Sequence, residues 1–179
     1  MGSWRWTWAG TGAVLAASTV ATAPALGSAA KAAAPAAAKV AAAQFVGDWH
    51  CAVSTVVSGV VVRIEGPQTY TKDGISQGSG TVTYIGPSGN ALKFATTFVG
   101  GWRVRGADLC ETLGQFEVSP ANPAARSERG QAILATLTKS FTTATQTRKE
   151  TCNRVTQLDD HALIGESLEN RAWVTRCTR

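Results

Sequence analysis

The chain has 179 residues and a formal net charge of +5. Three of its 17 basic residues, Arg5, Lys31 and Lys39, precede residue 45, which leaves 14 basic residues against 12 acidic ones in the remainder. A net charge of +2 from these scattered residues excludes the concentrated basic surface that nucleic-acid binding requires.

The first thirty residues have the pattern of an export signal. Arg5 supplies a positive charge, "AGTGAVLAASTVATAPAL" supplies an apolar region, and "GSAA" supplies the small residues that a signal peptidase requires. The apolar region contains Pro24 and is shorter than the roughly 20 strongly apolar residues of a membrane span. We therefore expect residues 1–30 to be a cleaved signal peptide. No stable membrane span is expected after cleavage, and the mature chain is expected to be periplasmic or secreted.

A low-complexity segment, "KAAAPAAAKVAAAQ", occupies residues 31–44. Pro35 and the lack of large apolar side chains leave this segment little to pack against a core, so we predict an Ala-rich tether. Residues 45–179 then form one domain of 135 residues. A domain of that length can bury about two-thirds of the surface of its unfolded chain.

From Val60 onward, apolar and polar residues alternate with the period of two that is typical of strands with one buried face. Four such segments follow one another: "VVVRIE", "TVTYI", "LKFATTF" and "WRVR". Turn residues punctuate them in "KDGIS", "GPSGN", "VGGW" and "RGAD". This spacing predicts an antiparallel meander of short strands.

A helix is predicted over residues 122–141. Asn122 followed by Pro123 is a typical helix start, whereas Gly130 is unfavourable within a helix. The apolar residues that recur at helical spacing are Ile133, Leu134, Leu137 and Phe141. Further strands are predicted near residues 143–158 and 171–177, and "DDHALIGES" between them supplies another short one.

These segments amount to eight or nine strands and one inserted helix. An open antiparallel sheet of that size would leave unpaired amides at its edges, and closure into a barrel removes them. We therefore expect a mainly β fold, an antiparallel up-and-down barrel with the helix inserted near residues 122–141. A two-sheet β-sandwich is the alternative.

The four cysteines predict two disulfides, for which three pairings are possible. If the first strand pairs with the last, Cys51 and Cys177 can meet, which leaves Cys110 and Cys152 as the second pair. The spacings of 59, 42 and 25 residues differ from the close pairs of zinc sites, so no metal site is expected.

The stretch "FVGDWHC" is predicted to close the barrel. Gly47 permits a tight start to the first strand, and Trp49 fills one end of the barrel beside Cys51. Trp173 shares a face with Cys177 in the last strand, which places a second indole at the same seam.

The motif "GDW", followed by "YTKDGISQGSG" and "GGWRVRGADLCETL", resembles small secreted bacterial domains of the lipocalin-like, or calycin, type over residues 45–113. The resemblance implies a lipocalin-like barrel whose interior takes a small apolar molecule. It also implies that the indole of Trp49 stacks against an Arg of the last strand. Arg171 is a candidate because it shares a face with Trp173. The chain departs from the lipocalin pattern because it lacks a mid-chain Thr-Asp-Tyr segment.

An interior stripe supplies the predicted ligand-binding residues, which are Tyr84, Phe94, Thr96, Phe98 and Trp102. Thr96 favours a cavity because a buried hydroxyl requires a polar partner. A barrel of about eight strands can instead be filled by its own side chains. The leading hypothesis is an exported, non-catalytic protein that binds a small apolar molecule.

No enzymatic site and no cofactor are expected. His50 is predicted to face outward, and Asp159, Asp160, His161 and Ser167 lack the nucleophile elbow and rigid spacing of a catalytic triad. An Asp-Asp pair before an apolar strand is more typical of a turn. The alternative function is a secreted inhibitor or an envelope-associated interaction module. Such a module would have a filled barrel core and an extracytoplasmic protein as its partner.

Overall fold

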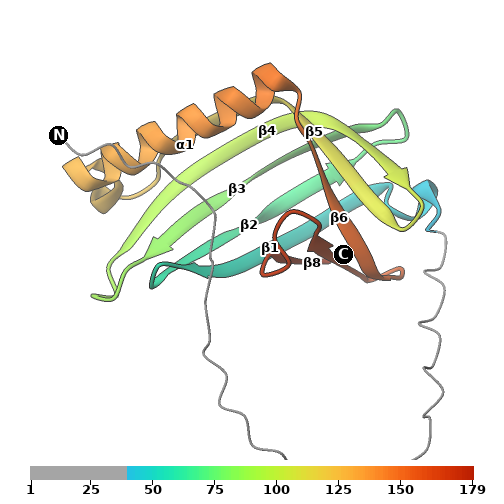
Figure 1. Ribbon diagram of the computed structural model, residues 1–179, viewed down its shortest axis with the longest axis horizontal. Helices are drawn as coiled ribbons and strands as arrows, with labels where there is room; N and C mark the ends of the chain where they lie inside the picture. The colour runs from blue at the N-terminus through green and yellow to red at the C-terminus, as the bar shows by residue number, and fades with distance from the viewer. Residues whose placement is uncertain (1–39) are drawn as a thin grey trace, which may run out of the picture. The chain divides into compact units, whose positions relative to one another are not determined.

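The computed structural model describes residues 40–179. The predicted signal peptide over residues 1–30 and most of the tether predicted over residues 31–44 lie outside the described residues. The described part is a closed antiparallel barrel in the strand order β1 to β8, with one long helix between β5 and β6 (Figure 1). This arrangement confirms the up-and-down barrel with an inserted helix, and the closed ring replaces the two-sheet alternative.

The strands are named in chain order. They are β1 (Gly47–Val57), β2 (Val60–Tyr70), β3 (Ile75–Ile85), β4 (Ala91–Arg105), β5 (Asp108–Pro120), β6 (Glu150–Leu158), β7 (Ala162–Ser167) and β8 (Val174–Thr178). The helical segments are η1 (Ala42–Gln44), η2 (Pro123–Arg126) and α1 (Glu128–Thr147). Because η1 lies within residues 31–44, the last part of the predicted tether belongs to the folded unit. Val40 packs against the core there.

β4 corrects the prediction of a turn at "VGGW". The strand runs without interruption through this segment, and its register with β5 shifts between Val99 and Gly100. A Cβ atom at Gly100 would lie only 2.1 Å from the carbonyl oxygen of Thr112. Gly100 therefore permits the close approach of two strands at a bulge. Glycine is favoured at such bulges as well as in turns, which is why the sequence pattern suggested a turn here.

The helical region also differs from its predicted bounds. Asn122 begins η2, and its side chain accepts a hydrogen bond from the backbone N–H of Ala125 at 3.0 Å. Ser127 then caps α1 by accepting from the N–H of Gly130 at 3.2 Å. The helix continues to Thr147, so the prediction of a strand from residue 143 was wrong by about two helical turns.

The threonine hydroxyls of this β-favouring segment find hydrogen-bond partners within the helix. Thr143 donates to the carbonyl of Lys139 at 2.9 Å, and Thr147 donates to that of Thr143 at 2.8 Å. These bonds satisfy the hydroxyl groups within the helix, while Phe141 packs its apolar face against the barrel. Tertiary packing therefore overrides the strand preference of threonine.

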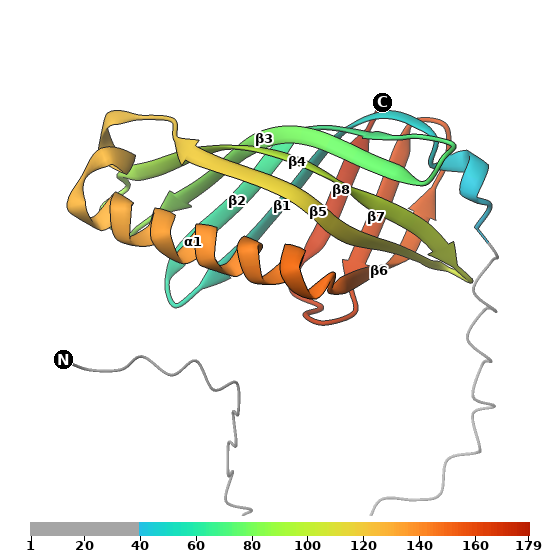
Figure 2. The same ribbon diagram turned by 90° about the horizontal axis from the view of Figure 1, so that it is seen from above.

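Some neighbouring strands of the barrel pair over only part of their lengths. β5 pairs with β6 over residues 108–112, and β1 pairs with β8 over residues 50–53. Beyond this region α1 runs along β5, as both views show (Figures 1 and 2). The rings of Phe116 on β5 and Phe141 on α1 are stacked with their centroids 3.6 Å apart. The helix thus covers the part of β5 that has no pairing with β6.

Two separate apolar clusters pack in the interior. The seam cluster surrounds the junction of β1 and β8 and contains Phe45, Trp49, Cys51, Tyr70, Trp102, Leu109, Leu163 and Cys177. The helix cluster contains Val62, Val82, Leu92, Phe94 and Ala125, with Ile133, Leu134 and Leu137 of α1 packed against it. The apolar helical positions predicted from the sequence therefore do face the barrel.

Two disulfides join strands that are neighbours in the sheet. Cys51 of β1 is bonded to Cys177 of β8, and Cys110 of β5 is bonded to Cys152 of β6. Each pair lies directly opposite in the strand register. The pairing inferred from barrel closure is confirmed, and two disulfides fit an oxidising extracytoplasmic location. Within residues 40–179, no helix combines the length and apolar character needed to span a membrane.

Candidate functional site

An interior cavity of about 370 Å³ separates the two clusters. Its wall combines apolar side chains from several strands and from α1. They include Val53, Phe98, Leu109, Leu113, Phe116 and Phe141. Gly66, Gly80 and Gly165 also border this space. A Cβ atom at Gly66 or Gly80 would collide with the backbone of the neighbouring strand, so these two glycines permit close approach of β2 and β3. The exposed residues Lys149 and Thr151 line it as well, so the cavity reaches the protein surface near the start of β6.

The five predicted ligand-binding residues do not form one site. Thr96 and Phe98 line the cavity, and the Thr96 hydroxyl donates to the carbonyl of Gly80 at 3.3 Å. Trp102 belongs to the seam cluster, whereas Phe94 and Tyr84 belong to the helix cluster. The structure therefore assigns two of the five residues to the cavity wall and three to the packed clusters.

Trp102 is a core residue. Its side chain is 8% exposed, and its indole Nε1 donates to the carbonyl of Thr71 at 3.0 Å. The ring packs against Tyr70 and Phe45, with centroid distances of 5.3 and 5.9 Å. Edge-to-face contacts of this kind stabilise a core in addition to the area they bury.

Glu111 is the one acidic side chain held by buried polar groups in the described interior. It is on β5 and faces the cavity, and its Oε1 accepts a hydrogen bond from Nε2 of Gln68 at 2.7 Å. The hydroxyl groups of Tyr70 and Ser76 also interact with its carboxyl group and favour its ionised form. Tyr70 and Ser76 are each 2% exposed, and Glu111 and Gln68 are half-buried.

Burial controls the protonation of Glu111. Loss of solvation raises the pKa of its carboxyl group to about 7, although the hydrogen bonds from Tyr70, Gln68 and Ser76 act in the opposite direction. Burial, followed by the nearby charge of Glu111, raises the pKa of Tyr70 well above its ordinary value. None of the ion pairs formed within residues 40–179 includes Glu111.

Glu111 was not identified from the sequence, although a signal for it exists. In "LCETL", Leu109, Glu111 and Leu113 alternate with outward positions, and two of these three residues are apolar. A carboxyl group on the apolar face of a strand is unusual and requires polar partners. Those partners come from β2 and β3, which the local pattern does not reveal.

The opening of β1 is arranged around Trp49 and Arg179. The guanidinium Cζ of Arg179 lies 3.9 Å from the centroid of the Trp49 ring, and the indole Nε1 donates to the carbonyl of Phe45 at 2.8 Å. Gly47 has a φ of 127°, and a Cβ atom there would lie 3.4 Å from Nη2 of Arg179. Gly47 thus allows both the backbone turn and the approach of the guanidinium.

Arg171 does not contact Trp49, which corrects the expectation that it would stack on this indole. It lies in an exposed turn before β8, since that strand begins at Val174 and is shorter than predicted. Trp173 precedes the strand, is partly exposed and lies outside the seam cluster. The role expected of Arg171 is filled by Arg179, which follows the last strand.

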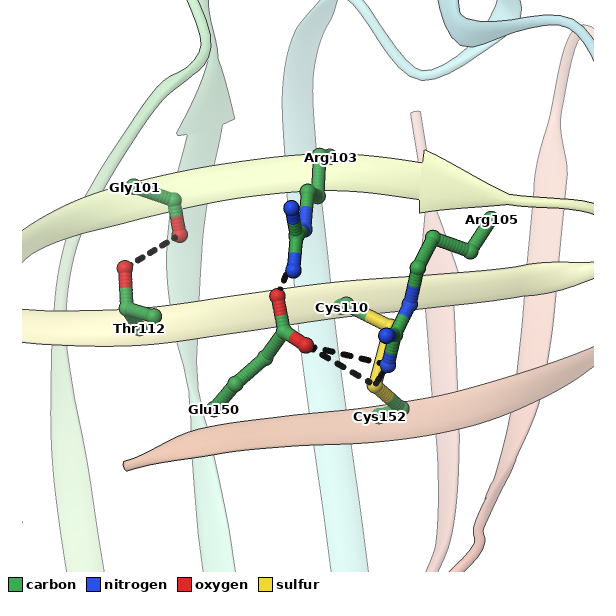
Figure 3. Close-up of polar contacts among 7 residues, drawn as sticks. All are labelled: Gly101, Arg103, Arg105, Cys110, Thr112, Glu150 and Cys152. Carbon is green, nitrogen blue, oxygen red and sulfur yellow. Dashed lines mark hydrogen bonds and ion pairs between the residues drawn. A yellow bond between two sulfur atoms is a disulfide. The ribbon is translucent and has the colours of Figure 1, made fainter. Parts of the chain in front are cut away.

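On the outer face, Glu150 lies between two guanidinium groups (Figure 3). Its Oε1 is 2.7 Å from Nε of Arg103, and its Oε2 is 3.0 Å from Nη2 of Arg105. The hydrogen bond from Arg103 is the main cause of a lowered pKa at Glu150. Among residues 40–179, Glu150, Cys110 and Cys152 are the one group with the proximity required of metal ligands. Because the two sulfurs are bonded to each other, they cannot act as thiolate ligands.

The residues considered for catalysis remain apart from the cavity. His50 and His161 are both exposed. Asp159 accepts hydrogen bonds from the N–H groups of His161 and Ala162 at 2.9 and 2.8 Å, which stabilise the turn between β6 and β7. This confirms the prediction of a turn at the Asp-Asp pair.

Comparison of the chain with models of known protein families finds no match, and none is found among curated proteins. The functional assignment rests on the cavity and on the side chains that line it.

Proposed function

We propose that the protein is an exported, non-catalytic binding protein that holds a small, mainly apolar molecule in the barrel cavity. The observation that carries this proposal is the interior space of about 370 Å³ between two packed clusters. Binding sites for small molecules are typically concave, largely apolar and about 300–1,000 Å³ in volume, with a few polar groups that orient the ligand. The cavity has this composition, and its polar groups include Glu111, Ser76 and Thr96.

Rigid surroundings support a binding role. The Cys51–Cys177 disulfide forms part of the cavity wall and joins β1 to β8. A preformed wall lowers the entropy that is lost when a ligand is ordered. The stacked rings of Phe116 and Phe141 supply the wall on the side of α1. A small molecule would thus meet a fixed apolar surface on both sides.

We also propose that the chain is related to the lipocalin-like proteins. The up-and-down barrel and the contact of Arg179 with Trp49 support this relationship, since the resemblance implies an indole stacked against a late Arg. The two disulfides support export to an oxidising compartment. The helix between β5 and β6 distinguishes this barrel from the simplest up-and-down form.

Calorimetric titration with octanol tests the binding role. Thr175 lines the cavity, whereas Thr178 on the same strand is exposed. We expect Thr175→Phe to fill part of the cavity and to weaken octanol binding about tenfold or more, a change of about 1.4 kcal/mol in binding free energy. Thr178→Phe adds the same ring outside and should leave the affinity unchanged.

Two results would contradict the proposal: no octanol binding to the unaltered oxidised protein, or equal binding by both variants. Native mass spectrometry of protein purified from an exporting host provides an independent observation, since a bound apolar molecule would be retained and could then be released and weighed. If the cavity takes no apolar molecule, the alternative is the interaction module with a filled core.

A further inference from the structure

The buried carboxyl group of Glu111 restricts which molecules the cavity can hold. Leu109 and Leu163 are apolar neighbours in the wall, and the Cys51–Cys177 disulfide lies on the same interior face. A carboxyl group in such surroundings is costly unless polar partners or an opposite charge compensate it. The donors and charges around Glu111 therefore indicate which chemical group of a ligand could pair with it.

The protein supplies hydrogen-bond donors to Glu111. Gln68 donates from β2, and the hydroxyl groups of Tyr70 on β2 and Ser76 on β3 also interact with this carboxyl group on β5. A carboxylate has about four acceptor positions, so a donor from a ligand can be added to the bond from Gln68. Because Glu111 lines the cavity, its carboxyl group is accessible from the binding space.

The protein supplies no positive charge to this group. Lys149 lines the outer part of the cavity, but its Nζ lies 2.9 Å from a carboxylate oxygen of Glu169. Glu65, which also borders the cavity, is paired with Arg63 at 2.6 Å. Within the described barrel, the charge of an ionised Glu111 is therefore not balanced by any ion pair.

We propose, on the basis of the binding function above, that the ligand is an apolar amine whose ammonium group pairs with the carboxylate of Glu111 while its hydrocarbon part fills the cavity. An ammonium group supplies the opposite charge that the described site lacks, together with a further hydrogen-bond donor, and such charge-assisted bonds are about twice as strong as neutral ones. Specificity follows because an alcohol supplies only the donor and a fatty acid adds a like charge.

The pKa of Glu111 is raised to about 7, which agrees with a carboxylate that has no positively charged partner in the protein. Amine binding should therefore strengthen as the pH rises through 7, because more of the protein then carries the charge. The other ionisable groups at the cavity are Tyr70, whose raised pKa keeps it protonated, and the paired side chains of Glu65 and Lys149.

The test compares octylamine, octanol and octanoate by calorimetric titration of the oxidised protein at about pH 5.5 and about pH 8, on either side of the Glu111 transition. We expect octylamine to bind about tenfold tighter than octanol at the higher pH and octanoate to bind most weakly. The preference for octylamine should shrink at the lower pH. This comparison uses the unaltered protein, so it does not depend on the folding of a variant.

Glu111→Gln supplies the second measurement. We expect this variant to lose about tenfold in octylamine affinity, with little change for octanol, and to lose the pH dependence of amine binding. Glu117→Gln is the matched control because Glu117 is exposed on the same strand and its replacement changes the net charge equally.

Distinct results would separate the two proposals. If octanol binds in the cavity but octylamine binds no tighter, or if Glu111→Gln weakens both equally, the amine proposal is overturned and the binding function stands. If none of the three probes binds, both proposals fail. A Glu117→Gln variant that weakens amine binding as much as Glu111→Gln would also overturn the assignment, since the effect would then arise from net charge.

Discussion

The guanidinium group of Arg179 covers the indole of Trp49, and its Nη2 donates to the carbonyl oxygens of Val46 and Gln44 at 2.8 and 3.1 Å. One side chain thus combines a cation–π contact with two hydrogen bonds to the segment that precedes β1. It fastens this segment to the end of the barrel where β1 and β8 meet.

Replacement of Arg179 by Ala should lower the free energy of unfolding by about 1–2 kcal/mol, because the cation–π contact and the carbonyl bonds are lost together. Arg171→Ala removes the same charge from an exposed turn and should change the stability by less than about 0.5 kcal/mol. Urea unfolding of the two variants measures the difference. Equal stabilities would contradict the role assigned to Arg179.

Trp102→Ala should destabilise the fold by about 3–5 kcal/mol, because it leaves a cavity among Phe45 and Tyr70 and removes the partner of a backbone carbonyl. Val99→Ala on the same strand provides the control, since Val99 is 40% exposed. Guanidinium unfolding monitored by circular dichroism measures both. A stable Trp102→Ala protein that loses only octanol binding would instead make Trp102 a ligand contact.

The stability of the protein should depend on pH through Glu111. In the unfolded chain this carboxyl group loses its proton near 4.5, whereas in the folded protein it retains the proton until about 7. Between these values the folded state binds more protons at this group, so the contribution of Glu111 to stability is greatest below about 4.5 and decreases as the pH rises to 7. The decrease attributable to this group is about 3 kcal/mol, since one pKa unit corresponds to about 1.4 kcal/mol.

Glu111→Gln should remove that contribution. Urea unfolding of the ligand-free protein and of the variant, at about pH 5 and about pH 8, gives the change in unfolding free energy with pH for each protein. The difference between the two changes cancels the contributions of the ionisable groups that both proteins share. We expect the stability of the variant to vary less across this interval. Parallel pH profiles would show that Glu111 titrates at the same pH in the folded and unfolded chains.

The two disulfides should contribute unequally to stability. The Cys51–Cys177 pair is separated by 126 residues and the Cys110–Cys152 pair by 42. Removal of either pair by double Ala substitution should cost about 2–5 kcal/mol, and the longer loop should cost about 1 kcal/mol more because loop-closure entropy grows with the logarithm of length. Unfolding of the two oxidised double variants tests the order. A larger loss for the shorter loop would contradict it.

Gly130→Ala should destabilise the protein even though Ala usually favours a helix by about 1 kcal/mol. A Cβ atom at Gly130 would lie 2.2 Å from the carbonyl oxygen of Ala125, a backbone atom of η2, so the two helical segments would have to separate. We expect a net loss of about 1–3 kcal/mol. Lys139→Ala, at an exposed position of the same helix, is the control, and thermal unfolding is the measurement. A gain in stability at Gly130 would show that η2 moves freely.

Much of the barrel could be predicted from the alternation of apolar and polar residues and from the positions of the cysteines. The alternating segments around Val62 and Val82 correspond to buried faces of β2 and β3, because strand period depends only on local backbone geometry. Cys51 and Cys177 could be paired because closure of an up-and-down barrel brings its first and last strands together. The continuity of β4 could not be predicted, since a glycine pair permits either a turn or a bulge.

The cavity and the environment of Glu111 were harder to predict from the sequence, for a physical reason. The environment of Glu111 is formed by Gln68, Tyr70 and Ser76, whose contacts depend on the register among the four strands β2 to β5. The assignment of Trp102 to the core depends similarly on Phe45, which lies far from it in the chain. Strand alternation indicates which face of a strand is buried. It does not determine at which depth of a barrel each side chain lies.

Because β8 is the neighbour of β1, the hydrogen-bonded ring stays incomplete until residues 174–178 are available. A chain delivered from its N-terminus can pair β1 through β5 in sequence as a hairpin meander, while the outer edge of β1 still lacks its partner. An unpaired edge is a template on which other chains can add strands. The outer edge of β1 therefore stays open to aggregation until the final strand arrives.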